Sequence, residues 1–149
     1  MLRADAGVLH LWRQRCPELC ELWPARGGKI QRWKGVKFGR GASKGRVVEI
    51  DLSDQDLTGG VPAELGKLAA LSGLNLSDNQ LTAAVPSELG KLTALKDLCL
   101  EHNQLANVPA ELGYLTALSV LNLSDNQLTS IPAALGNLSS LSGLYLSDN

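Results

Sequence analysis

The sequence predicts a right-handed α/β solenoid, with one parallel sheet on its concave side and short helical turns on its convex side, preceded by a helical cap. Two observations lead to this fold. The segments 47–70, 71–94, 95–117 and 118–140 share one pattern of leucines, and a fifth copy begins at Leu141. An asparagine also recurs at the same place in successive copies. One such unit cannot enclose its own leucines, whereas stacked copies bury them in a continuous core.

The segment 71–94 shows how one unit is built. Leu74 and Leu76 are separated by one polar residue, which is typical of a strand with one buried face. Pro86 suits the first position of a short helix, because its missing N–H costs nothing there. Gly90 suits a left-handed exit from that helix. We therefore expect a short strand, a bend, and one or two turns of α- or 3₁₀-helix in each unit.

The recurring asparagines are Asn79, Asn103 and Asn126, which stand between leucine-bearing positions, so we expect their amides to be largely buried. A buried amide without partners costs about 1–3 kcal/mol. Each is therefore expected to bond the backbone of its own turn or a neighbouring one. Gln55 takes this place in the first copy, where a departure is tolerable because an end repeat has only one neighbour.

The pattern LxxLxLxxNxLTxxVPxELGxL resembles that of the leucine-rich-repeat family, and its LTG-x-VP middle is similar to the plant-type repeats of receptor kinases and resistance proteins. The resemblance covers residues 47–149, with 141–149 as a partial repeat. It implies a non-catalytic scaffold that recognises a protein or peptide on its concave face, in signalling or defence. The alternative is a structural spacer in a larger multidomain signalling protein.

Residues 1–46 are expected to form a helix followed by a basic, tryptophan-containing cap. The WxGV motif at 33–36 resembles the N-terminal cap of the family, where a cysteine pair usually flanks the motif. The corresponding places here hold Gln31 or Arg32 and Phe38, which leaves no cap disulfide. This favours a reducing compartment. Since no secretory signal is visible, the sequence predicts a cytoplasmic protein.

An apolar stripe at helical spacing marks the start of the chain: Val8, Trp12, Cys16, Leu19 and Trp23. Asp5 is a plausible N-cap, and Pro17 should kink the helix or start a second one. We expect the helix to cover the open edge strand and bare leucines of the first repeat. A membrane-surface or partner-binding helix is the alternative.

The cysteines Cys16, Cys20 and Cys99 match neither a redox pair nor a zinc half-site. Cys16 and Cys20 lie among apolar residues and are predicted to be buried free thiols. No nucleophile motif, cofactor loop or metal-ligand spacing is recognisable elsewhere. The sequence therefore predicts no enzyme, no cofactor and no metal site.

Charge is divided unevenly along the chain. Eleven of the 14 Lys and Arg lie in residues 1–46, and twelve of the 15 Asp and Glu lie in residues 47–149. The preferred interpretation is that the two parts attract each other within one fold. Polyanion binding through the basic residues 24–46 is the alternative, although no RNA- or DNA-binding motif is present and no nucleic-acid partner is expected. No run of residues is long enough for a membrane span.

The candidate binding site is the strand face that points away from the leucines. Most turns end this face with the same Ser-Asp pair, and the third turn and Tyr145 depart from it. Drift at exposed positions is the alternative explanation. The predicted partner-binding residues are Asp97, Cys99, Glu101, His102, Asn122, Asp125 and Tyr145. The acidic column Asp54, Asp78, Asp125 and Asp148 predicts a basic protein or peptide as the partner.

Asn149 follows directly on the strand of the fifth copy. Terminal repeats normally need a polar outer face. We therefore expect these residues either to be a fragment or to self-associate through the uncapped C-terminal repeat.

Overall fold

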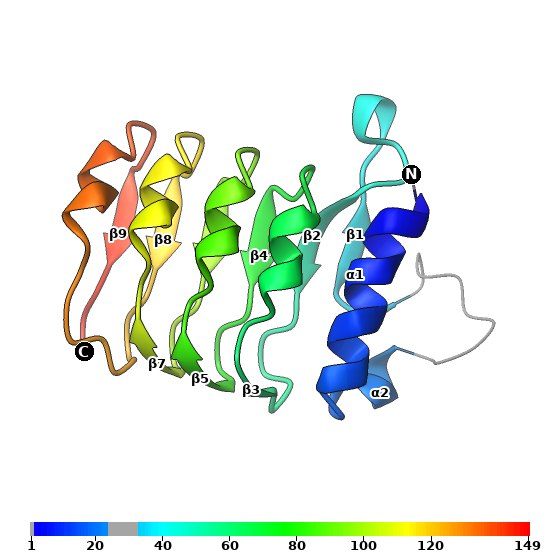
Figure 1. Ribbon diagram of the computed structural model, residues 1–149, viewed down its shortest axis with the longest axis horizontal. Helices are drawn as coiled ribbons and strands as arrows, with labels where there is room; N and C mark the ends of the chain where they lie inside the picture. Colours follow the sequence, from blue (N-terminus) through cyan, green and yellow to red (C-terminus); the bar gives the residue numbers. More distant parts are fainter. Residues whose placement is uncertain (1, 24–32) are drawn as a thin grey trace.

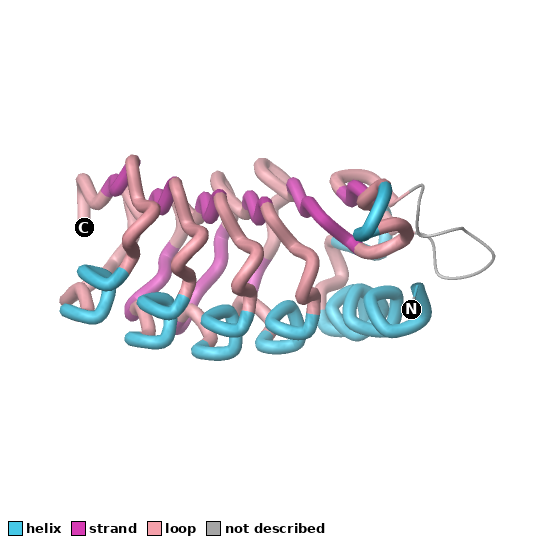
Figure 2. Tube along the Cα trace, turned by 90° about the horizontal axis from the view of Figure 1, so that it is seen from above, coloured by secondary structure: helices cyan, strands magenta, loops and turns pink. Residues whose placement is uncertain are grey.

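The computed structural model describes residues 2–23 and 33–149 and shows a chain that winds through successive, nearly identical turns (Figure 1). The helix α1 (Leu2–Arg15) lies at one end of the array and the strand β9 (Gly143–Tyr145) at the other. Figure 2 shows a row of strands along one side and the short helical turns along the opposite side, with further strands between them. The predicted α/β solenoid is confirmed.

The main sheet has six strands in the order β1-β2-β4-β6-β8-β9. Its five parallel strands are β2 (Val47–Asp51), β4 (Gly73–Asn75), β6 (Asp97–Cys99), β8 (Val120–Asn122) and β9. The central leucines pair in register, Leu74 with Leu98 and Leu98 with Leu121. They are buried and point into the core, so the residues on either side of them face outward.

A second, three-stranded parallel sheet departs from the expectation of one sheet. It consists of β3 (Thr58–Gly59), β5 (Gln80–Ala84) and β7 (Gln104–Asn107). Stacking places the equivalent segments of consecutive turns side by side, and the buried Leu57, Leu81 and Leu105 hold them against the core. Their backbone groups then pair, for example through the N–H of Gln80, which donates to the carbonyl of Leu57 over 2.9 Å.

The convex side carries one 3₁₀ turn per repeat, namely η3 (Ala63–Lys67), η4 (Ser87–Lys91), η5 (Ala110–Tyr114) and η6 (Ala133–Asn137). The prediction that Pro86 is the first helical residue is wrong by one position. Its φ of −70° and ψ of 138° are extended, and the turn begins at the next residue. Proline fixes the approach of the chain to the turn and disfavours a helical conformation in the residue before it.

The left-handed exit predicted at Gly90 is also wrong. Gly90 is not among the positive-φ residues of the described chain. Instead, a Cβ at this position would lie 2.4 Å from the carbonyl oxygen of Glu111 in the next turn. Gly66 and Gly113 meet the following turn in the same way, at 2.3 Å. These glycines allow adjacent convex turns to approach closely.

The N-terminal cap closes the core with aromatic residues. All five residues of the predicted apolar stripe are buried, and α2 (Leu19–Leu22) starts after Pro17. Trp23 stacks on Trp33 with ring centroids 4.9 Å apart, and its indole N–H donates to the carbonyl of Lys34. Cys20, which is not part of this stripe, is exposed, so the prediction that it is a buried thiol is wrong.

Two further predictions about the cap need correction. The edge strand β2 is covered not by α1 but by β1 (Val36–Phe38), which pairs with it antiparallel. The helix α1 packs against η3, on the convex side of the core. Asp5 is not the N-cap, because α1 begins before it. The Asp5 carboxylate is buried and accepts hydrogen bonds of 2.9 Å from the Arg46 Nε and the Val47 amide.

Candidate recognition surface

The outward residues of the parallel strands form four rows across the main sheet, which we call the sheet face and which corresponds to the predicted concave face. The strand register aligns the first two rows. In strand order, the rows are Glu49, Gly73, Asp97, Val120, Gly143; Asp51, Asn75, Cys99, Asn122, Tyr145; Ser53, Ser77, Glu101, Ser124, Ser147; and Asp54, Asp78, His102, Asp125, Asp148. Each row therefore takes one residue from each of five turns. The third and fourth rows follow the strand ends, and Ser77 and Ser124 of the third row are buried rather than presented to solvent.

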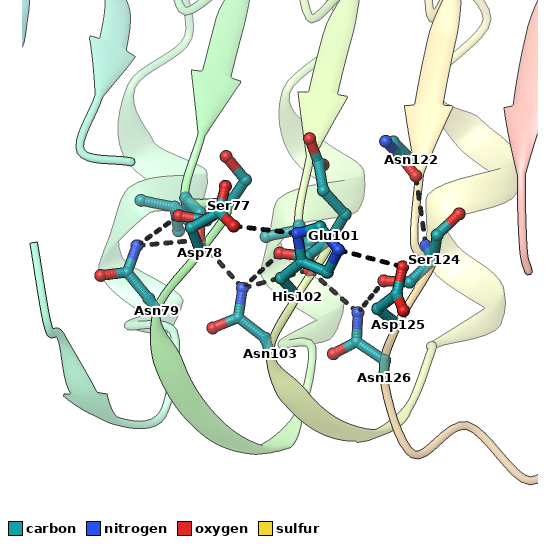
Figure 3. A network of polar contacts seen from close by, with 12 residues as sticks. Ser77, Asp78, Asn79, Glu101, His102, Asn103, Asn122, Ser124, Asp125 and Asn126 are labelled. Atoms are coloured by element: carbon teal, nitrogen blue, oxygen red, sulfur yellow. Dashed lines mark hydrogen bonds and ion pairs between the residues drawn. The ribbon is translucent and has the colours of Figure 1, made fainter. Parts of the chain in front are cut away.

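The side chains of Asn79, Asn103, Asn126 and Asn149 form a series that we call the asparagine ladder, which lies next to the third and fourth rows and bonds each turn to its neighbour (Figure 3). The Asn103 amide N–H₂ donates to the carbonyls of Leu76, Leu100 and Glu101, and its Oδ1 accepts from the Leu81 amide. Asn79, Asn126 and Asn149 bond in the same way. The predicted bonds to the residue's own and a neighbouring turn are confirmed.

The fourth row has an unusual backbone. Asp54, Asp78, His102, Asp125 and Asp148 all lie in the left-handed region, with φ between 52° and 54°. Asp, Asn and His enter this region more readily than other non-glycine residues. The repeated Asp is therefore explained partly by the turn that follows each strand, and not only by a charged partner.

His102 takes part in an ion-pair network within this row. Its Nδ1 lies 2.9 Å from Asp78 Oδ1 and its Nε2 lies 3.1 Å from Asp125 Oδ2. Figure 3 shows the ring between the two carboxylates. The hydrogen bond to Asp78, followed by the charges of Asp125, Asp78 and Glu101, raises the pKa of His102 above 6.5. When the ring is protonated, it offsets part of the negative charge of this row, which is the charge predicted to attract a basic partner.

A hollow of about 280 Å³ opens on the first two rows. Gly73 leaves a gap between Glu49 and Asp97, and Cys99 lies on the adjacent wall. The residues that line the hollow are Glu49, Ile50, Asp51, Ser72, Gly73, Leu74, Asn75, Lys96, Asp97 and Cys99. Two of the predicted site residues, Asp97 and Cys99, therefore border a concave volume.

The thiol of Cys99 is half-buried and surrounded by negative charge. Burial, followed by the charges of Glu101, Asp97 and Asp51, raises the pKa of the thiol to about 11. The Cys99 thiol is therefore neutral at physiological pH and is not activated as a nucleophile.

The remaining predicted residues are spread along the sheet face. Asn122 is half-buried, and its Oδ1 accepts from the Ser124 amide. Tyr145 is 54% exposed, and its ring lies over Gly143, where an added Cβ would be 3.0 Å from Tyr145 Cε2. Tyr145 stands two strands away from Cys99 and outside the hollow.

The structure thus divides the predicted site into three parts. Asp97 and Cys99 line the hollow, Glu101, His102 and Asp125 lie in the third and fourth rows, and Asn122 and Tyr145 lie in the second row outside the hollow. Sequence reasoning missed the contribution of Glu49, Asp51, Gly73 and Lys96 to the hollow. The sequence did contain a signal for this hollow, because Gly73 stands where the equivalent positions of the two neighbouring turns hold Glu49 and Asp97.

Ion pairs join the basic and acidic parts of the chain, which supports the interpretation that they attract each other. Lys37 of β1 pairs with Glu49, and Arg15 of α1 pairs with Glu64. The segment 24–32, including the cap positions Gln31 and Arg32, lies outside the described residues. Phe38, at the other cap position, is partly buried against the core.

Two negative findings apply to the part of the chain that the structure describes. No group of three or more His, Cys, Asp and Glu side chains is placed to hold a metal ion there. Over the same residues, no helix has the length and apolar character needed to cross a membrane.

Two family models, both described as leucine rich repeat, match residues 70–92 and 95–149. The chain belongs to the leucine-rich-repeat family. No match was found among curated proteins.

Solved structures place the fold among plant receptor ectodomains. The BIR2 ectodomain from Arabidopsis thaliana has a TM-score of 0.85 at 28% identity, over 95% of this chain and 78% of that one. The plant peptide hormone receptor RGFR1, in complex with RGF2, has a TM-score of 0.65 at 36% identity, over 75% of this chain and 21% of that one. A plant ice-binding protein has a TM-score of 0.87 at 27% identity, over 97% of this chain and 48% of that one. The fold is thus shared by proteins with different ligands.

Proposed function

We propose that the chain is a non-catalytic recognition scaffold, which binds a protein or peptide segment along the sheet face in signalling or defence. One observation carries the proposal. The residues that interrupt the repetition in the third turn, Asp97 and Cys99, border the hollow on the sheet face. A side chain there that does not serve the core is free to contact a partner.

The backbone beneath this surface is suited to recognition. The asparagine ladder bonds each strand end to the next turn, so the outward side chains stand on a rigid support. Binding then costs conformational entropy of the partner, but no further entropy is lost by ordering the scaffold. The complex of the similar receptor RGFR1 with RGF2 supports the peptide class of partner.

The test is selection of a random peptide library on the immobilised chain, followed by affinity measurements with paired variants. Asp97→Lys and Tyr145→Ala should each weaken binding by more than about 1 kcal/mol while the melting temperature stays unchanged. Glu101 is less suited to this test, because its Oε2 is shielded and has no hydrogen-bond partner among the described residues. The matched controls are Lys67→Glu and Lys91→Glu on the exposed convex side. Loss of binding in the controls alone would contradict the assignment.

We further propose that the protein works in a reducing, cytoplasmic compartment. Cys16, Cys20 and Cys99 are all free thiols. The Cys16 thiol is buried and hydrogen-bonded to Glu18, and burial followed by that bond raises its pKa to about 12. Alkylation of the protein in intact cells, followed by mass spectrometry, should find all three thiols reduced. A disulfide involving any of them would contradict the proposal.

A further inference from the structure

The hollow on the sheet face has a specific arrangement of charge. Gly73 pairs with Glu49 on one neighbouring strand and with Asp97 on the other. Adjacent strands are about 4.8 Å apart, so the two acidic residues flank a gap about two strand spacings wide. The stem of Glu49 leans toward this gap, since its Cγ would lie 3.3 Å from a Cβ added to Gly73.

Negative charge outweighs positive charge around this gap. Three carboxylates, those of Glu49, Asp51 and Asp97, line the hollow together with a single ammonium group, that of Lys96. Lys37 comes from β1 at the edge of the sheet, and its Nζ lies 2.5 Å from Glu49 Oε1. The Glu49 side of the hollow therefore already accommodates one basic group. The charges of Asp51, Asp97 and Glu101 also all act on the neighbouring Cys99 thiol and raise its pKa.

We propose that the hollow over Gly73 is a subsite for one arginine side chain of the bound partner, with the guanidinium placed between Asp97 and Glu49. This inference rests on the proposed function and specifies the chemistry of its ligand. A planar guanidinium donates in several fixed directions and can bond carboxylates on two sides. Gly73 is required because any larger side chain at this position would occupy the gap.

The experiment uses the full chain, isotope-labelled for NMR, and a short blocked peptide with one arginine between glycines. The same peptide with citrulline, a neutral isostere of arginine, is the matched probe. The arginine peptide should shift the amide resonances of Gly73, Asp97 and Cys99. The citrulline peptide should bind roughly tenfold more weakly, because charge-assisted hydrogen bonds are about twice as strong as neutral ones. Equal binding of the two peptides would overturn the proposal.

Two pairs of variants locate the subsite. Gly73→Leu fills the gap and Asp97→Asn removes one carboxylate, and both should abolish the difference between the peptides. Val120→Leu changes the same row in the fourth turn, and Glu111→Gln removes an exposed carboxylate from the convex side, so both variants should keep the difference between the peptides. If the arginine effect survives Gly73→Leu in a folded protein, the subsite is elsewhere and the proposal fails.

The same variants separate this inference from the proposed function. Peptides selected from a random library that bind through Tyr145, without arginine and without sensitivity to Gly73→Leu, would overturn the subsite and leave the recognition scaffold standing. Selected peptides that respond only to convex substitutions would overturn the recognition scaffold on the sheet face.

Discussion

The N-terminal cap and the repeat array bury their cores in different ways. In the cap, a few large residues contact one another across long stretches of chain, as Trp23 does with Trp33 and Asp5 with Arg46. In the array, small identical contributions recur, because each turn buries an equivalent set of leucines and each asparagine side chain of the ladder bonds its own turn and the turn before. The difference teaches that loss of one residue should be severe and global in the cap, but graded by position in the array.

The largest effect is expected in the cap. Trp33→Ala should lower the free energy of unfolding by about 3–5 kcal/mol, since the ring is buried and stacked on Trp23. Urea unfolding followed by circular dichroism measures the change. Tyr114→Ala, at a position 67% exposed, is the control and should leave the midpoint in place. An equal loss of unfolding free energy in the two variants would contradict the distinction between cap and array.

The asparagine ladder should show a gradient. Asn103→Ala leaves the buried Leu81 amide without its partner and removes one of two hydrogen bonds from each of the carbonyls of Leu76, Leu100 and Glu101, which should cost about 1–3 kcal/mol. Gln55→Ala should cost less, because the Gln55 amide N–H₂ donates only within its own turn and its Oε1 accepts one exposed bond, from Lys34 Nζ at 3.4 Å. Urea midpoints of the two variants test the order. The opposite order would show that the ladder is not cooperative along the array.

Close contact between convex turns gives a third comparison. Gly90→Ala places a methyl group 2.4 Å from the Glu111 carbonyl oxygen and should destabilise by about 1–3 kcal/mol. Gly136→Ala is the matched control, because no atom lies within 4 Å of the added Cβ. Thermal melts of both variants measure the difference. A melting temperature for Gly90→Ala equal to that of the parent would show that the turns separate at no cost.

The smallest effect concerns pH. Since the His102 pKa is raised above 6.5, the protonated ring stabilises the fold fully below about pH 6.5, and this contribution is lost as the pH rises through the raised pKa. The melting temperature of the parent should therefore fall slightly relative to that of His102→Gln between about pH 6 and pH 8. The shift is small because the His102 side chain is 54% exposed, so solvent screens its ion pairs. Parallel pH profiles of the two proteins would contradict this ion-pair network.

The sequence alone determined the features that depend on repetition. Leu74 and its equivalents predicted the strands, and Asn79, Asn103 and Asn126 predicted the ladder, because a periodic apolar pattern with a buried amide has few ways to satisfy both packing and hydrogen bonding. The apolar stripe from Val8 to Trp23 likewise predicted a buried helical face. These features are local or repeat at a fixed spacing, so they can be read without knowing which segments meet.

Only the tertiary structure decided the features that depend on which atoms meet between turns. Gly90 is small because the Glu111 carbonyl approaches it, and β1 rather than α1 covers the edge strand. His102 is held by carboxylates from the turns on either side, and the hollow exists because Gly73 falls between Glu49 and Asp97 in the strand register. None of these contacts joins sequence neighbours. The antiparallel β1–β2 pair arises from the return of the cap onto the first repeat. The other contacts arise from the stacking of successive turns, which brings residues about one repeat apart to within a few ångströms.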